Sequence, residues 1–187
     1  MRNIFAPFAL LLVLSGHAWA DIAPPPSVMA VDPRCTISVG NGTINYGTQT
    51  KAQLQSSGPQ LTPGKRTLML SVACPFAREI RLGVQGERTG DGSLRYGDLG
   101  QLKVRLVDAQ LDGQPVALRD ISTGGQPEVW NMSLKAGSRF EVSHNSLPLN
   151  GKSFSARLEI EPLISESAVR VSHQTTSEAR LSFDLLD

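Results

Sequence analysis

Polar and apolar side chains alternate without a break in Ser153-Phe154-Ser155-Ala156-Arg157-Leu158-Glu159-Ile160. Successive side chains of a β-strand point to opposite faces of its sheet, so this pattern predicts a strand with one buried and one solvated face. A second run of the same period covers residues 179–185, where Ala179, Leu181, Phe183 and Leu185 alternate with Arg180, Ser182 and Asp184. We therefore expect two half-buried strands in the last part of the sequence.

Shorter runs of the same period occupy the rest of the chain. Further strands are expected around Leu68, Leu70, Val72 and Cys74; Ile80, Leu82 and Val84; Leu102, Val104 and Leu106; Phe140 and Val142; with shorter candidates around Ile37, Ile44 and Val116. No window of useful length shows a 3.6-residue period, and prolines interrupt most of the longer candidates. At most one or two helical turns are expected, near residues 51–56.

Turn signals fall between these runs. The pairs that accept positive φ are Asn41-Gly42, Asp91-Gly92, Asp112-Gly113 and Asn150-Gly151. Residues 102–118, with Asp112-Gly113 inside them, are predicted to form a hairpin. Seven or so short strands separated by turns indicate an all-β fold, an immunoglobulin-like antiparallel β-sandwich, in one domain without internal repeats.

Composition excludes some classes of protein. The chain has 187 residues, of which 40% are hydrophobic and 19% charged, enough to bury a core. Lys and Arg total 18 and Asp and Glu total 17, and no segment gathers basic residues. A nucleic-acid-binding function is therefore not expected, because such a protein needs a cluster of cations for phosphates.

The first 20 residues have the pattern of a signal peptide. Arg2 precedes an apolar run over residues 8–14, and Ala18-Trp19-Ala20 offers small residues for a signal peptidase. A membrane anchor is the alternative, but the apolar run is shorter than the roughly 20 residues that span a bilayer. We expect residues 1–20 to be removed on export and no membrane span to remain.

Cys35 and Cys74 are the only cysteines. In an oxidising compartment an even count favours a single disulfide over free or metal-bound thiols. A metal site needs more ligands than two isolated cysteines, and a redox site normally has a Cys-x-x-Cys pattern, which is absent here. We expect one structural disulfide and no metal.

Catalytic motifs are absent from the sequence. Nothing matches a nucleophile elbow, a zinc-protease helix or a phosphate-binding loop. His144 and His173 are interpreted as polar residues at strand ends, and Glu159 and Glu161 as a solvated strand face. Trp130 is expected to pack inward with Met132 and Leu134, the alternative being a contact for a partner or a glycan. No enzyme activity and no cofactor are predicted.

Three segments together resemble the first half of a chaperone-usher fimbrial (pilin) subunit: residues 35–39 (CTISV), 42–47 (GTINYG) and 68–74 (LMLSVAC). The two alternating strands, at residues 153–160 and 177–186, match the end of that family's domain. The order of elements across residues 35–187 is most similar to the beta-fimbrial group of fimbria-like proteins. The resemblance implies that the disulfide joins the first two strands of the sandwich.

The resemblance also implies an incomplete sandwich. The last alternating run ends at Leu185, so we expect a missing closing strand and an apolar groove beside the final strand. Its expected walls are Ile37 and Val39 on one side and Ala179, Leu181, Phe183 and Leu185 on the other. In the family a periplasmic chaperone lends a strand, and a neighbouring subunit's N-terminal extension replaces it at the outer-membrane usher. The expected function is therefore that of a structural or minor subunit of a surface fimbria that contributes to cell adhesion, passing through the periplasm on its way to the cell surface.

Residues 21–34 form the candidate N-terminal extension. Pro24, Pro25 and Pro26 each remove a backbone donor, so only residues 27–31 pair well. Val28 and Ala30 are the donor side chains, the alternative being Met29 and Val31. Two features of the family's chaperone-recognition signature, a next-to-last aromatic residue and a glycine some 14 residues from the end, are missing. A minor, tip or initiating position remains open. The alternative is a free-standing exported immunoglobulin-like binding or accessory protein that does not polymerise.

Overall fold

The structure is a computed structural model, which describes residues 34–124, 126–169 and 174–186. The expected signal peptide, the donor residues Val28 and Ala30, and His173 lie outside the described residues. Two 3₁₀ turns, η1 (Lys51–Gln53) and η2 (Glu166–Val169), are the helical elements of the described residues. The turn at η1 confirms the short helical segment predicted near residues 51–56.

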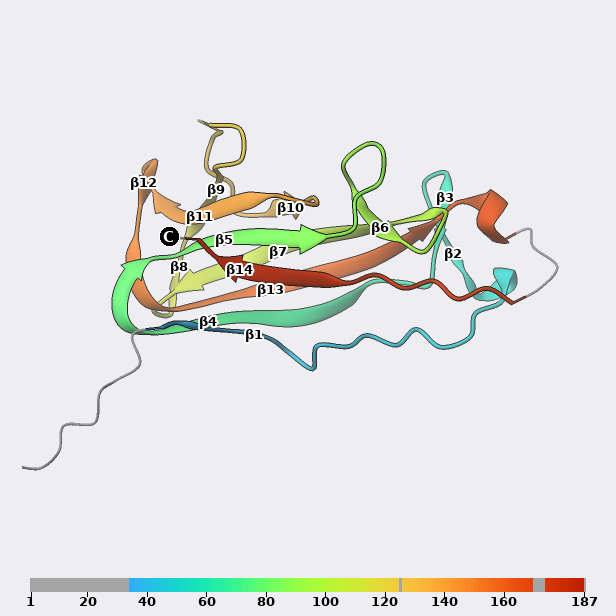
Figure 1. Ribbon diagram of the computed structural model, residues 1–187, viewed down its shortest axis with the longest axis horizontal. Helices are drawn as coiled ribbons and strands as arrows, with labels where there is room; N and C mark the ends of the chain where they lie inside the picture. Colours follow the sequence, from blue (N-terminus) through green and yellow to red (C-terminus); the bar gives the residue numbers. More distant parts are fainter. Residues whose placement is uncertain (1–33, 125, 170–173, 187) are drawn as a thin grey trace, which may run out of the picture. The chain divides into compact units, whose positions relative to one another are not determined.

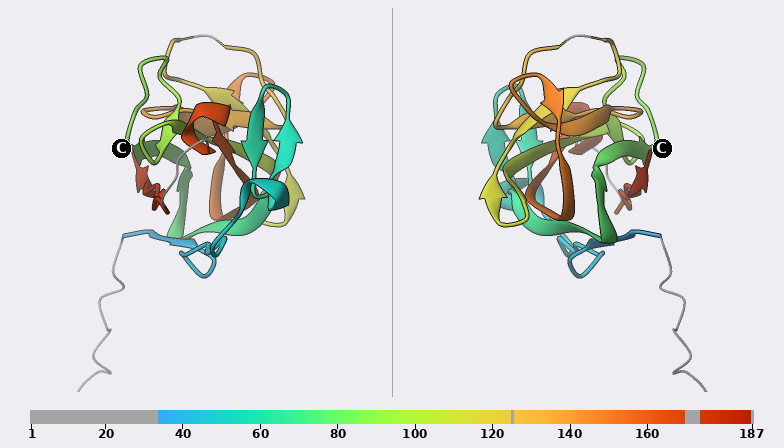
Figure 2. Two further views of the ribbon diagram at one scale, coloured as in Figure 1. Left: turned by 90° about the vertical axis from the view of Figure 1, so that its right-hand side faces the viewer. Right: turned by 90° about the vertical axis from the view of Figure 1, so that its left-hand side faces the viewer.

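Strands of the described residues form two antiparallel sheets packed face to face (Figures 1 and 2). The first sheet contains β1 (Thr36–Val39), β2 (Gln55–Ser57), β3 (Gln60–Thr62), β4 (Arg66–Glu79), β6 (Leu94–Tyr96), β7 (Gly100–Leu111), β8 (Gln114–Pro115), β10 (Met132–Leu134) and β13 (Asn150–Ile164). The second contains β5 (Arg81–Gly86), β9 (Ala117–Asp120), β11 (Arg139–His144), β12 (Leu147–Pro148) and β14 (Leu181–Leu185). The predicted β-sandwich is confirmed.

β13 is the central strand of the first sheet. It pairs with β4 on one edge, where Phe154 faces Val72, and with β7 on the other, where Leu158 faces Leu106. The alternation that predicted this strand places Phe154, Ala156 and Leu158 in the core with almost no exposed surface. The second sheet covers them with fully buried residues of its own: Leu82, Val84, Leu118, Phe140 and Val142.

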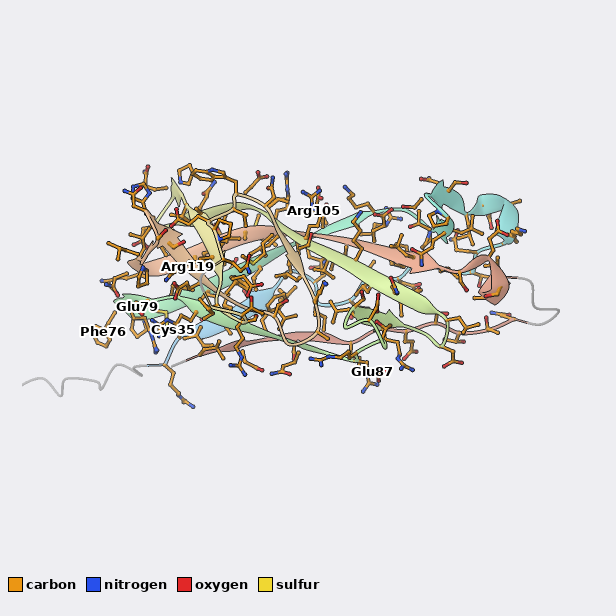
Figure 3. All side chains as sticks on the ribbon, turned by 90° about the horizontal axis from the view of Figure 1, so that it is seen from above. Cys35, Phe76, Glu79, Glu87, Arg105 and Arg119 are labelled. Atoms are coloured by element: carbon orange, nitrogen blue, oxygen red, sulfur yellow. A yellow bond between two sulfur atoms is a disulfide. The ribbon has the colours of Figure 1, made fainter. Side chains whose placement is uncertain are left out.

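The disulfide joins Cys35 to Cys74, as predicted. Cys35 immediately precedes β1, and Cys74 lies in β4, the strand that pairs with β1. Cys35 lies at the same end of the sandwich as Phe76 and Glu79 (Figure 3). The bridge therefore ties the short β1 to the much longer β4 at one end of the molecule.

The predicted hairpin turn at Asp112-Gly113 is confirmed, but the second arm is only β8, because residues 117–118 belong to β9 of the second sheet. Leu111 pairs with Gln114, and both turn residues have positive φ (49° and 80°), as a type I′ turn requires. The Asp112 carboxylate accepts hydrogen bonds from the backbone N–H groups of Lys152 and Ser153, the latter at 2.8 Å. The turn is thereby fixed against the start of β13.

Asn150-Gly151 does not form the predicted turn. Both residues belong to β13 and pair with Glu79 and Arg78. A Cβ on Gly151 would lie 2.5 Å from the side chain of Leu111, so glycine is needed there for close packing rather than for a reversal. The chain reverses between β11 and β12 at Asn145 and Ser146, whose φ values are 52° and 63°.

The candidate strand around Ile44 was also wrong, and the one around Val116 is divided into two short strands. Ile44 lies in an extended segment outside any strand of the described chain. Val116 lies between β8 and β9, where the chain passes from the first sheet to the second. Val116 is buried because of this crossing, and its N–H donates to the Ala109 carbonyl at 3.0 Å.

Trp130 does not pack inward as predicted, because 63% of it is exposed, whereas Met132 and Leu134 are buried. Val129 exchanges two backbone hydrogen bonds with Leu118, at 2.8 and 2.9 Å, and is half-buried. Val129 and Met132 are three positions apart, so the alternation loses its phase in the bend at residues 130–131. The bend leaves Trp130 on the outside.

Candidate functional site: a groove between two edge strands

β14 and β1 are edge strands on the same side of the sandwich (Figure 2). β14 pairs with β5 on one edge, and no strand of the described residues pairs with its other edge. β1 likewise pairs with β4 alone among the described strands. The side between β1 and β14, which we call the open side, therefore presents two strand edges to each other.

The register shows which backbone groups of β14 face the open side. Leu186 N–H donates to the Arg81 carbonyl at 3.0 Å. In an antiparallel ladder every second residue bonds to the neighbouring strand, and the residues between point their backbone groups the other way. Ser182 and Asp184 therefore bond to β5. The N–H and C=O groups of Leu181, Phe183 and Leu185 point to the open side, and the side chains of these three residues turn inward.

β1 has the same arrangement. Gly40 N–H donates to the Met69 carbonyl at 2.8 Å. Because bonded residues alternate along an antiparallel ladder, the backbone groups of Ser38 and Thr36 also point toward β4. The backbone groups of Ile37 and Val39 consequently point to the open side. Both facing edges present the N–H and C=O groups of residues whose apolar side chains are half-buried or buried.

A groove of about 1120 Å³ lies along this side. Its rims are residues 42–49, continuing from β1, and residues 174–180, leading into β14, with Val39, Leu181 and Phe183 at one end. Its floor is made by side chains from the first sheet and its connections: Leu54, Leu68, Tyr96, Leu102, Ile160 and Ile164. These floor residues are mostly half-buried, so apolar surface remains open to water.

The groove narrows toward the disulfide. Some Cα atoms of β1 and β14 lie within 8 Å of one another. A strand placed between two others needs them about 9.6 Å apart, twice the usual spacing of 4.8 Å. This end is therefore closed, and the groove opens from Val39 onward.

Two tyrosines mark the far end of the groove. Tyr46 Oη donates to the Ile160 carbonyl at 3.4 Å, and the Arg66 guanidinium lies 5.9 Å from the centre of its ring. Burial, with a smaller contribution from Tyr96, raises the pKa of Tyr46 to about 12. Burial also raises the pKa of Tyr96. Both phenols are therefore neutral hydrogen-bonding groups at physiological pH.

The structure places the expected wall residues as follows. Val39, Ala179, Leu181 and Phe183 line the groove, whereas Ile37 and Leu185 lie beyond its closed end. Ala179 is exposed and precedes β14. The floor residues Leu102 and Ile160 were predicted as inward strand positions, but periodicity did not indicate that they lie beside the open side.

Other polar clusters of the described residues have structural explanations. Glu141 is 3% exposed and accepts hydrogen bonds from Arg119 (2.8 Å from Nε) and Arg81 (3.3 Å), which ties β9, β11 and β5 together. Glu159 and Glu161 face outward, where they pair with Lys65 and Lys103. His144 is exposed at the end of β11.

No cluster of three or more His, Cys, Asp or Glu side chains among residues 34–124, 126–169 and 174–186 has the arrangement of a metal site. Within the same part of the chain, no helix is long and apolar enough to cross a membrane. No protein-family model matches the sequence, and a search of curated proteins returns no match.

Proposed function

We propose that this chain is a subunit of a bacterial surface fimbria and that its groove accepts a β-strand from another polypeptide. The observation that carries the proposal is an apolar-floored groove that continues from two facing edges, those of β1 and β14, neither of which pairs with a second described strand. In transit through the periplasm the strand would come from a chaperone, and at the outer-membrane usher from a neighbouring subunit. The proposal assigns the chain no catalytic role.

Backbone hydrogen bonding favours a strand as the occupant. An unpaired strand edge recruits extended chains, because its N–H and C=O groups pair in register with those of another strand. β1 and β14 run in opposite directions along the sandwich (Figure 1). A strand between them is therefore parallel to one and antiparallel to the other, and it pairs with both edges at once.

Burial of the apolar groove floor would stabilise the bound strand further. Alternate side chains of an inserted strand would point at the half-buried floor residues Leu54, Leu68 and Ile164 and remove their exposed surface from water. Apolar burial contributes about 25 cal/mol per Å². The occupant would thus be held by main-chain bonds to both rims and by apolar side chains against the floor.

Insertion also has to open the closed end. β1 has four residues, and it is held to β4 by its ladder and by the disulfide at Cys35. Moving β1 or β14 outward by a few ångströms would admit the strand beside Ile37 and Leu185. Donor insertion should therefore begin at the open far end and finish near the disulfide.

Thermal unfolding tests the proposal. The chain is heated with and without an excess of a ten-residue peptide of alternating threonine and valine, because a ligand that binds only the folded state raises its Tm. We expect a rise of several degrees for the chain and for Ser182→Asp, whose side chain is exposed on the outer face of β14. Phe183→Asp and the milder Leu181→Asp should lose the rise, because a charge would enter the apolar groove.

A Tm that the peptide leaves unchanged in the chain itself would contradict strand acceptance. That outcome, with a stable monomer that needs no donor, would favour a free-standing exported binding or accessory protein. Equal Tm rises for Leu181→Asp and Ser182→Asp would place the peptide elsewhere on the surface.

A further inference from the structure

Most of the groove lies beyond the two edge strands. One rim runs from Gln174 to Phe183, of which only the last three positions belong to β14. The other rim runs from Val39 to Gln49, of which only Val39 belongs to β1. Figure 1 shows both rims continuing along the sandwich past their strands. Nine residue steps of extended chain, from 174 to 183, span about 30 Å.

The far half of the groove, between residues 42–49 and 174–180, is held in place by specific contacts. Gly97 N–H in the β6–β7 turn donates to the Glu178 carbonyl at 2.9 Å. A Cβ on Gly97 would lie 2.6 Å from Ser177 Oγ, so the two segments are in close contact. On the other rim Tyr46 bonds to the Ile160 carbonyl. Both rims of the far half are therefore fixed to the first sheet by hydrogen bonds.

The candidate N-terminal extension, residues 21–34, offers a short donor segment. Pro24, Pro25 and Pro26 on one side and Pro33 on the other enclose six residues, 27–32 (SVMAVD). Prolines lack the N–H that a ladder requires, so at most about 20 Å of chain can pair. Alternation gives this segment only two inward apolar side chains in either phase, Val28 and Ala30 or Met29 and Val31. A strand of ten alternating residues would present five apolar side chains to the groove floor.

We propose that the natural occupant is a proline-free, alternately apolar segment of at least ten residues from a different polypeptide, and not residues 27–32 of a second copy. This inference rests on the proposed function, because it specifies the strand that the groove accepts. A ten-residue strand fits the length of the groove and can cover its apolar floor into the far half. The six residues 27–32 are too short to do so. The chain then acts as an acceptor for an unlike partner rather than as the repeating unit of a homopolymer.

Two peptides test the inference on the full chain: SVMAVD, copied from residues 27–32, and the same ten-residue peptide of alternating threonine and valine. Affinities are measured by titration calorimetry. We expect the ten-residue peptide to bind at least tenfold more tightly. Equal or tighter binding of SVMAVD would overturn the inference and leave the proposed function standing, whereas no binding of either peptide would overturn both.

A substitution in the far half tests whether that half is occupied. Ala168 in η2 lines the groove and is half-buried, so Ala168→Trp would fill the far end without disturbing the core. Ala52→Trp is the matched control, because Ala52 is exposed in η1 and does not line the groove. Ala168→Trp should weaken the ten-residue peptide at least tenfold and Ala52→Trp should not. Unchanged affinity in Ala168→Trp would show that the far half plays no part.

Discussion

The two long sides of the sandwich differ in how their strand edges are treated. On the side we call closed, described residues 121–124 and 126–131 lie between β9 and β10, and Leu118 and Val129 exchange two backbone hydrogen bonds. On the open side β1 and β14 have no described strand between them, and a groove continues beyond them. One side thus has a main-chain bridge between β9 and the segment that leads to β10, and the described strand edges β1 and β14 have no such bridge between them.

The difference between the two sides does not extend to the core. Phe183 in β14 is only 8% exposed, a fraction similar to those of the buried residues on the closed side. What the open side lacks is main-chain pairing and cover for the groove floor. Function on this account depends on edges rather than on missing core side chains.

Removing the disulfide should have the largest effect on the comparison, since it frees β1, one rim of the open side. The cysteines are 39 positions apart, and the chain-entropy treatment gives about 4 kcal/mol for a loop of this length. Cys35→Ala with Cys74→Ala should lower the free energy of unfolding in urea by that amount. A reductant should destabilise the natural chain and leave the double variant unchanged. A loss below about 1 kcal/mol would contradict the role given to the bridge.

Two core truncations compare the sides directly. Leu118→Ala on the closed side and Phe183→Ala on the open side should each cost about 3 kcal/mol in urea, because both residues are buried. Only Phe183→Ala should also weaken the ten-residue peptide, by tenfold or more, since only Phe183 lines the groove. Equal effects of both variants on peptide affinity would remove the distinction between the sides.

High pH should weaken the open side through Tyr46. Its pKa of about 12 in the folded chain lies above the value of about 10 expected after unfolding. The folded state keeps a proton that the unfolded state releases, so stability should fall as the pH rises from 10 to 12. Tyrosinate absorbance and the urea midpoint measure this, with Tyr46→Phe as the control that lacks this contribution. Titration of Tyr46 near pH 10 would contradict its burial.

Low pH should have a smaller effect, on the closed side. Ser146 N–H donates to the Glu128 carboxylate at 2.7 Å, and this bond lowers the pKa of Glu128. The contribution of Glu128 is therefore present at neutral pH and is lost as the pH falls below about 4.3 through the lowered value. The amide shift of Ser146 followed by NMR should report the change, and Glu128→Gln should abolish it. A Ser146 shift that persists in the variant would mean that another group titrates.

The sequence predicts the strands well because burial on one face leaves a local signal. Residues 153–160 and 181–185 show the period that their sheets require. Trp130 escapes this reasoning because its alternation breaks at a bend, and Gly151 because its role is packing against Leu111, a residue distant in sequence.

The groove is only partly predictable from the sequence, because it is formed by residues that are distant in the sequence. Periodicity marks Phe183 and Ile160 as inward, but strand order decides that both lie beside the open side. Ala179 shares the pattern of β14 yet precedes the strand, and Ile37 and Leu185 lie past the closed end of the groove. Which edges remain unpaired is a property of the whole topology.

Amide hydrogen exchange along β14 tests the central claim most directly. In the isolated chain the amides of Leu181, Phe183 and Leu185 should exchange quickly, because they point to the open side, while those of Ser182 and Asp184 are protected by β5. Adding the ten-residue peptide should protect the first three. If Leu181 and Phe183 are already protected as strongly as Asp184 without the peptide, the edge is not free and strand acceptance is wrong.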